Sequence, residues 1–177
     1  MADTHPAQAL DVIKRVEMMC DFLKNPIITQ AIENGVPVTM PRLPGALGFD
    51  VPLWVGFGMV GIWAALDAFA ERAGLPGANC ETCQGRTCIR ARFDDRLQDN
   101  EERSSFAEIE DIRHLYAHNF AGHADEQYFS RPRHVLASGT QTELASGAEF
   151  NGERLQLDLI DLRFYSSIAQ NVLSRFS

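Results

Sequence analysis

The chain has 177 residues, of which 45% are hydrophobic and 23% are charged, an ordinary composition for a globular protein. A chain of this length buries most of its apolar surface around one core, so we expect a single helical domain over residues 1–177. The formal net charge of -8 argues against a general nucleic-acid coat protein, because non-specific affinity for phosphates comes from Lys and Arg. A local basic cleft on an acidic body can still bind RNA.

The sequence shows no sign of membrane insertion or secretion. The N-terminus has no basic start followed by an apolar run, so we predict no secretory signal. The longest apolar stretch, Val51 to Leu66, contains Pro52 and three glycines and is closed by Asp67. This stretch is short for a membrane span, and we interpret it as a helix buried between other helices. We therefore predict a cytoplasmic protein with no membrane partner.

The first half of the chain is predicted to contain two helices and two loops. Apolar residues at helical spacing predict a helix over residues 6–24. Residues 34–52 are rich in Pro and Gly and are predicted to form a long surface loop. A second helix is predicted over residues 53–73, because a Gly and then a Pro follow it. Residues 77–92 are expected to form a loop that carries cysteines.

The second half is predicted to contain two more helices with a hairpin between them. The third helix should begin near Asn100 and run past Tyr116, with its acidic residues near the N-terminus, where the helix dipole favours them. The Asn-Gly pair within residues 150–153 predicts a hairpin turn, and the alternating leucines after it predict a short strand. Helical spacing returns from Asp158 or Asp161 onward. The predicted fold is mainly α: a four-helix bundle of the up-and-down type, with a small β-hairpin before the C-terminal helix.

The densest group of chemically active side chains lies near the end of the third predicted helix. It includes Arg113, His114, His118, Asn119 and His123. Histidine exchanges protons near neutral pH, and arginine binds phosphate oxygens through two parallel hydrogen bonds. Folding alone does not explain this concentration, so we interpret the segment as the candidate functional site.

Arg113 and His118 form an Arg-x-x-x-x-His motif, which Asn119 follows directly. This motif resembles the signature of HEPN domains, where it lies near the start of a late helix of a four-helix bundle and faces a dimer partner. The resemblance implies a homodimer that binds RNA or cleaves it without a metal. In that role His118 would transfer the proton and Arg113 would stabilise the charge on the phosphoryl oxygens, with Asn119 and His114 as further site residues.

Two positions differ from the family pattern. The residue after the Arg is often a polar residue such as Asn, whereas here it is His114. One toxin branch carries a Tyr two residues after the His, and a partner nucleotidyltransferase modifies that Tyr. The chain has Phe120 at this position, so it departs from that kind of toxin–antitoxin pair.

The spacing within the motif also favours a dimer. Two side chains five residues apart on one ideal helix point about 140° away from each other, at about 100° per residue. A two-fold dimer brings both copies of Arg113 and His118 together, so the two kinds of side chain can meet without a strongly bent Arg113 side chain.

Two other interpretations of the same segment remain possible. Glu110, His114 and His118 follow one another at i, i+4 spacing, which can ligate a metal and would make the protein a metal-dependent hydrolase. Alternatively, His114 is a solvated helix residue and His118 is a hydrogen-bonded residue at the helix end, where the dipole favours it without any function.

The cysteines suggest a different class of function. Cys80, Cys83 and Cys88 have the spacing of zinc ligands, but Phe93 occupies the position where the fourth ligand is expected. A fourth ligand would have to come from His5, His123, His134 or elsewhere. The alternative is therefore a non-catalytic helical interaction module with a structural zinc. Free or redox-active thiols are the competing interpretation.

Overall fold

The computed structural model describes residues 5–23, 51–77, 80, 88–118, 144–151 and 154–176. Within these ranges the chain is mainly helical and has one small antiparallel β-hairpin, which directly precedes the C-terminal helix. Both features confirm the predictions of a mainly α chain and of a small hairpin before the C-terminal helix. Most of the predicted loop over residues 34–52 lies outside the described residues, as do Cys83 and Asn119.

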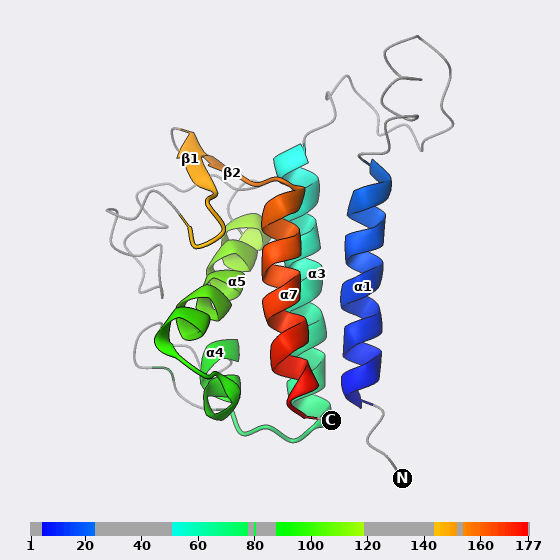
Figure 1. The fold of residues 1–177 in the computed structure, drawn as a ribbon, viewed down its shortest axis with the longest axis vertical. Helices are drawn as coiled ribbons and strands as arrows, with labels where there is room; N and C mark the ends of the chain where they lie inside the picture. Colours follow the sequence, from blue (N-terminus) through cyan, green and yellow to red (C-terminus); the bar gives the residue numbers. More distant parts are fainter. Residues whose placement is uncertain are drawn as a thin grey trace.

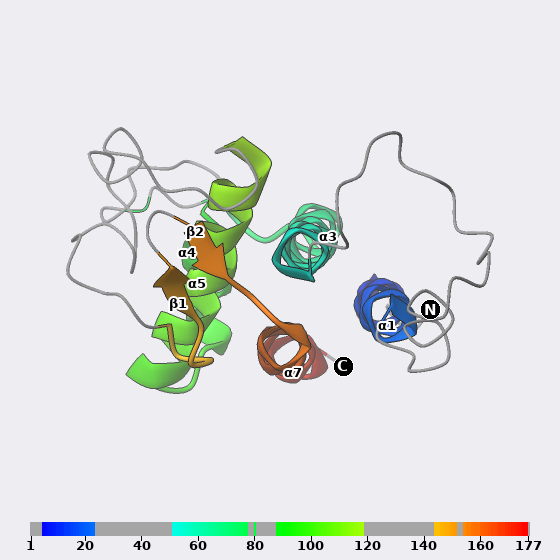
Figure 2. The ribbon, with the colours of Figure 1, turned by 90° about the horizontal axis from the view of Figure 1, so that it is seen from above.

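Four long helices make up most of the described chain: α1 (His5–Leu23), α3 (Val51–Arg72), α5 (Asn100–His118) and α7 (Leu159–Ser174). Each lies within a few residues of a helix predicted from the sequence. Figure 1 shows α1 and α5 running upward and α3 and α7 running downward, with α5 inclined to the other three. Seen end-on in Figure 2, α3 lies between α1 and α5 and also has α7 beside it.

The core is built around α3 and joins all four long helices. On α3 the fully buried positions recur at helical spacing, and they include Val55, Met59, Ile62, Leu66 and Phe69. Near the C-terminal end of α3, the Phe69 ring lies 6.0 Å from that of Phe93 and 5.0 Å from that of Phe176. These aromatic contacts hold the last turn of the chain against the core.

A short helix, α4 (Ile89–Phe93), and a 3-10 turn, η1 (Asp94–Arg96), precede α5. The prediction of a loop over residues 77–92 is therefore wrong from Ile89 onward. Ile89 and Phe93 lie one helical turn apart, and both are completely buried. A helix of five residues is too short to give a periodic pattern, so the sequence does not predict it.

The start of α3 also differs from the prediction, because this helix begins at Val51 and includes Pro52. The predicted loop over residues 34–52 is thus two residues too long at its end. Pro52 is compatible with the first turn of a helix, because an N–H at that position has no partner within the helix.

The hairpin consists of β1 (Glu149–Asn151) and β2 (Arg154–Gln156), which pair in an antiparallel register. The alternation of leucines does not continue as a strand beyond β2, since Leu159 already belongs to α7. The reason is a helix cap: the Asp158 carboxylate accepts hydrogen bonds from the backbone N–H groups of Ile160 and Asp161, at 2.6 and 3.3 Å.

Two buried hydrogen-bond systems fasten this hairpin region to the helices. The Tyr116 hydroxyl on α5 donates to the Leu155 carbonyl of β2 at 3.0 Å. The Glu108 carboxyl accepts from the backbone N–H of Ala145 at 3.2 Å and from the Tyr165 hydroxyl at 2.5 Å. Burial raises the pKa of Glu108, because a charged carboxylate is poorly solvated there.

An ion pair joins the start of α5 to the end of the chain. The two terminal nitrogens of Arg175 each bind one oxygen of Glu102, both at 2.7 Å. The hydrogen bonds from Arg175 hold the pKa of Glu102 below its ordinary value. This paired geometry fixes the first turn of α5 against the residue that follows α7.

Helix α5 approaches α3 closely because Gly56 has no side chain. A Cβ atom added at Gly56 would lie only 2.0 Å from Cδ1 of Tyr116. Tyr116 is 4% exposed and cannot move outward without breaking its bond to Leu155. The distance between these two helices is therefore set by a glycine on one and an aromatic ring on the other.

Gly56→Ala should destabilise the protein by about 1–3 kcal/mol, because it overpacks this contact. Urea denaturation followed by circular dichroism measures the free energy of unfolding. In a Tyr116→Leu background, which leaves room at this point, the same substitution should lose most of its cost. Equal costs in the two backgrounds would show that the two residues do not determine the helix spacing.

Candidate functional site

The candidate residues Arg113, His114 and His118 lie on the last turns of α5, which ends at His118. Here we call these three residues the α5-end cluster. The HEPN resemblance implies a motif near the start of a late helix, whereas this motif lies at the end of α5. The chain departs from the family pattern in this respect.

Arg113 packs against an aromatic residue of the neighbouring helix. Its guanidinium carbon lies 4.1 Å from the centre of the Trp63 ring on α3, which is close enough for a cation–π interaction. Arg113 is half-buried, and within the described part of the chain its Nε atom is buried without a hydrogen-bond partner. The planar Trp surface therefore restricts how the guanidinium can lie.

Two carboxyl groups lie within electrostatic reach of Arg113. Asp67 pairs with Arg92 at 2.8 Å, and burial raises the pKa of Asp67 while the charge of Arg92 opposes that rise. Burial likewise raises the pKa of Glu110, and the charge of Arg113 partly lowers the pKa of each of these carboxyls. The surroundings of Arg113 thus include both acidic and basic groups, namely Asp67 on α3, Arg92 on α4 and Glu110 on α5.

The two histidines of the cluster lie side by side. Their ring centres are 4.7 Å apart and their ring planes are inclined by 54°. His118 is exposed and His114 is half-buried. One accessible imidazole and one sheltered imidazole are therefore close enough to act on the same small group.

Glu110, which forms part of the proposed metal-binding face, has other partners in the structure. Its carboxyl accepts a hydrogen bond of 2.9 Å from the backbone N–H of Ile89 and also bonds with the Cys88 side chain. Among the described residues, no three His, Cys, Asp or Glu side chains gather closely enough to hold a metal ion. Glu110 thus serves as a cap for α4, supplied from another helix.

The structure describes two of the three predicted zinc ligands. Cys80 and Cys88 are both buried, and neither forms a disulfide. Cys83 lies outside the described residues, as do His123 and His134 and the side chain of His5. The zinc site stays a prediction.

No local sequence pattern predicts that Arg113 lies over Trp63, or that Asp67 with its partner Arg92 lies within electrostatic reach of Arg113. From the sequence alone, Trp63 is expected in a buried helix, and Asp67 is expected only to close the apolar stretch. An Asp and a Trp four residues apart in an otherwise uncharged segment were the available signal, because they share one helix face. Arg92 could not be placed without α4.

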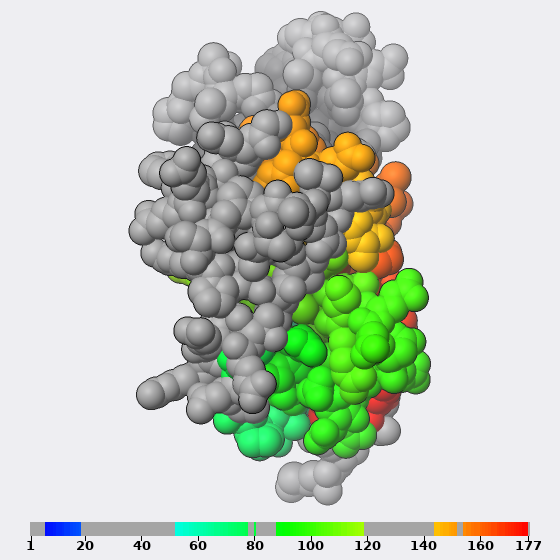
Figure 3. Space-filling model, turned by 90° about the vertical axis from the view of Figure 1, so that its left-hand side faces the viewer, coloured from blue at the N-terminus to red at the C-terminus, as the bar shows by residue number. Residues whose placement is uncertain are grey.

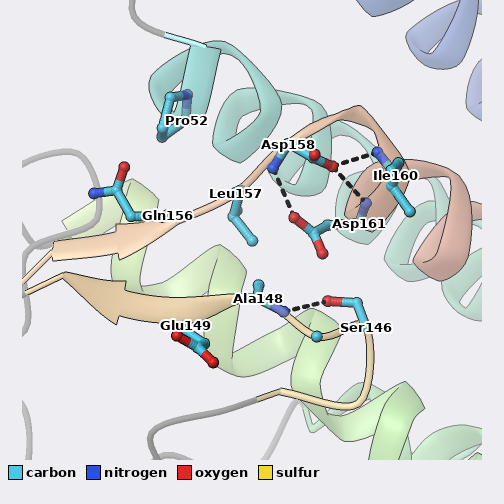
Figure 4. A pocket seen from close by; sticks show the side chains of 10 residues that line it. Pro52, Ser146, Ala148, Glu149, Gln156, Leu157, Asp158, Ile160 and Asp161 are labelled. Atoms are coloured by element: carbon cyan, nitrogen blue, oxygen red, sulfur yellow. Dashed lines mark hydrogen bonds between the residues drawn. The ribbon is translucent and has the colours of Figure 1, made fainter.

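A separate open hollow of about 590 Å³ lies between the hairpin and the start of α7. Figure 4 shows that Glu149, Asp158 and Asp161 lie around it, and that the Asp158 cap occupies one side. Three carboxyl groups make this hollow unsuitable for a phosphate, because like charges repel. The α5-end cluster is therefore a better candidate than this hollow for binding an anionic substrate. Figure 3 shows the hairpin, which borders the hollow, in orange above the green surface of α4 and α5.

Comparison with known proteins found no matching family model, no similar curated protein and no similar solved structure.

Glu110→Gln should change how stability depends on pH. Because the pKa of Glu110 is higher in the folded protein, its stabilising contribution is complete below the unfolded value and is lost as pH rises through the folded value. Gln keeps an oxygen that can accept from Ile89 but cannot ionise. The parent should therefore lose stability relative to the variant as pH rises from about 4.5.

Urea denaturation of both proteins at several pH values measures this difference. Glu101→Gln, at an exposed position of the same helix, is the matched control for the change in net charge. A constant difference between parent and Glu110→Gln at all pH values would contradict the assignment.

Proposed function

We propose that this protein is a HEPN-like RNA endonuclease or RNA-binding regulator that acts as a homodimer, and that its four long helices form an up-and-down bundle. The proposal rests on the Arg-x-x-x-x-His motif of Arg113 and His118. The mainly helical fold, with a hairpin before the last helix, is compatible with it. The placement of the motif at the end of α5 is where the chain differs most from the family pattern.

The observation that carries the proposal is the contact between two imidazoles on the last turns of α5, which also carry a positioned guanidinium. The rings of His114 and His118 are 4.7 Å apart, and Arg113 lies over the Trp63 ring of α3. Cleavage of RNA by its own 2′-hydroxyl needs a group that accepts a proton, a group that donates one, and a cation for the phosphoryl oxygens. The α5-end cluster contains all three kinds of group.

In the proposed reaction the ribose 2′-oxygen attacks the adjacent phosphorus atom while neutral His118 accepts the hydroxyl proton. The bond from phosphorus to the 5′-oxygen breaks, and protonated His114 gives its proton to that leaving oxygen. The products are a 2′,3′-cyclic phosphate and a free 5′-hydroxyl. Arg113 stabilises the extra negative charge on the phosphoryl oxygens, and the Trp63 ring limits the motion of its guanidinium beforehand.

His118→Ala should reduce RNA cleavage by about 10²- to 10⁴-fold, because it removes the proton acceptor. The fold should be retained, since His118 is exposed at the helix end. The assay uses an RNA oligonucleotide in excess chelator, with gel analysis of the products and detection of the cyclic phosphate. A DNA oligonucleotide of the same sequence should stay intact, because it lacks the attacking hydroxyl.

Arg15→Lys is the matched control for the Arg113→Lys substitution described next, because Arg15 is an exposed residue of α1. Arg113→Lys should also reduce cleavage, since an ammonium cannot bind two phosphoryl oxygens in the same plane. Equal cleavage by the parent and by His118→Ala would refute the catalytic assignment. Cleavage of the DNA strand would refute the proposed chemistry.

A further inference from the structure

Two carboxyl groups lie near Arg113, and the short helix α4 binds both of them. The Asp67 carboxylate on α3 accepts a hydrogen bond of 2.8 Å from a terminal nitrogen of Arg92. The Glu110 carboxyl on α5 accepts one of 2.9 Å from the backbone N–H of Ile89. Helix α4 packs against both α3 and α5, and Figure 1 shows it beside α5. One short element therefore occupies both acids.

Both acids are placed where they could bind Arg113 if α4 did not hold them. Glu110 lies three residues before Arg113 on α5, a spacing at which an acid and a base on one helix can pair. Asp67 lies one turn beyond Trp63 on α3, and the Arg113 guanidinium carbon is 4.1 Å from the centre of the Trp63 ring. Burial raises the pKa of each carboxyl, and the charge of Arg113 opposes that rise in both. Arg113 is thus within electrostatic reach of either acid.

Arg113 nevertheless pairs with neither acid. Among the described residues the ion pairs join other side chains, and the Nε atom of Arg113 is buried without a hydrogen-bond partner. The guanidinium lies over the Trp63 ring in a cation–π contact instead. A ring face, unlike a carboxylate, does not use up the N–H groups of an arginine in hydrogen bonds. The guanidinium on Trp63 can therefore still bind phosphoryl oxygens.

Asp67 would attract Arg113 strongly if Arg92 did not bind it. The Asp67 side chain is 25% exposed, and the Arg92 side chain is 11% exposed. A carboxylate that loses its partner in such a partly buried position is poorly solvated, so it attracts any cation within reach. Burial raises the pKa of Asp67, and the two positive charges that oppose this rise belong to Arg92 and Arg113. Without Arg92, Arg113 is the cation to which Asp67 would turn.

The backbone of Arg92 is held in place by the burial of α4. Ile89 and Phe93, on either side of Arg92, are completely buried in the core. The backbone N–H of Arg92 donates to the Cys88 carbonyl at 3.2 Å, which closes the first turn of the helix. Arg92 therefore extends toward α3 from a fixed point, and its ion pair with Asp67 does not depend on a mobile surface segment.

We propose that Arg92 is a positioning residue: it binds Asp67, prevents Asp67 from capturing Arg113, and so keeps the Arg113 guanidinium on Trp63 and available for phosphate. The catalytic part of this inference rests on the proposed function, whereas the placement of Arg113 does not. A carboxylate and a phosphoryl group bind a guanidinium through the same paired N–H groups. Asp67, once released from Arg92, is therefore an internal competitor of the RNA phosphate.

Arg92→Met tests this role, because it removes the charge and keeps a long unbranched side chain. It should lower RNA cleavage by about 10- to 100-fold, mainly in kcat, since Arg113 acts on charge that develops in the transition state. Adding Asp67→Asn removes the competitor, so the double variant should cleave within about threefold of the parent rate. Arg90→Met, which removes a charge from the same short helix, is the matched control and should cleave like the parent.

Tryptophan fluorescence follows the position of Arg113 without RNA. The chain has two tryptophans, so in a Trp54→Phe background the emission comes from Trp63 alone. Indole emission shifts when a charge over the ring moves away, and Arg113→Met gives the spectrum without that charge. Arg92→Met should shift the emission toward this spectrum, and adding Asp67→Asn should restore the parent emission. When Arg113 is already Met, Arg92→Met should have little further effect on the emission.

Circular dichroism confirms that each variant is folded, and Arg92→Gln replaces Arg92→Met if that protein loses its helical signal. Unchanged Trp63 emission in the Arg92 variant would overturn the proposal. So would a loss of cleavage that Asp67→Asn does not restore, because Arg92 would then only support the fold. The expected emission changes in a protein that never cleaves RNA would support the placement of Arg113 and refute the proposed function. The same changes with cleavage at the parent rate would overturn the role of Arg92 in the reaction.

Discussion

The close contact between α3 and α5 is the constraint on which the rest of the structure depends. Gly56 lets the Tyr116 ring lie directly against the α3 backbone, and the Tyr116 hydroxyl then reaches the hairpin. One turn earlier on α5, the Arg113 guanidinium lies over Trp63. The same pair of helices therefore determines the helix spacing, the position of the hairpin and the orientation of the candidate site.

The long elements could be predicted from the sequence because their apolar periodicity and their end signals agree. Helix α3, for example, ends just before Gly74, whose φ of 66° few other residues adopt easily. The hairpin is short but has a local turn signal, whereas the short helix α4 has none and could not be predicted. Helix α4 depends on burial of Ile89 and Phe93 and on a cap from Glu110, and these are tertiary contacts that a local pattern does not contain.

The candidate site was predictable as a set of side chains but not as an arrangement. The sequence indicated Arg113, His114 and His118 because their chemistry is unusual in one short segment. It could not show that Trp63 would lie under the guanidinium, since that contact joins residues fifty positions apart. Nor could it show that Glu110 turns toward α4 and away from a metal-binding role with the histidines.

Two carboxyl groups of α5 have pKa values shifted in opposite directions, so the contacts that they make respond oppositely to acid. Glu102 at the front is bound to Arg175 as an anion, so that contact weakens when protons are added. The buried carboxyl of Glu108 favours the protonated form, so its surroundings become less favourable when protons are removed. Strong acid should therefore weaken the contact at the first turn of this helix, whereas a rise in pH above the ordinary pKa range of Glu should weaken the contacts of Glu108 in the middle of the helix.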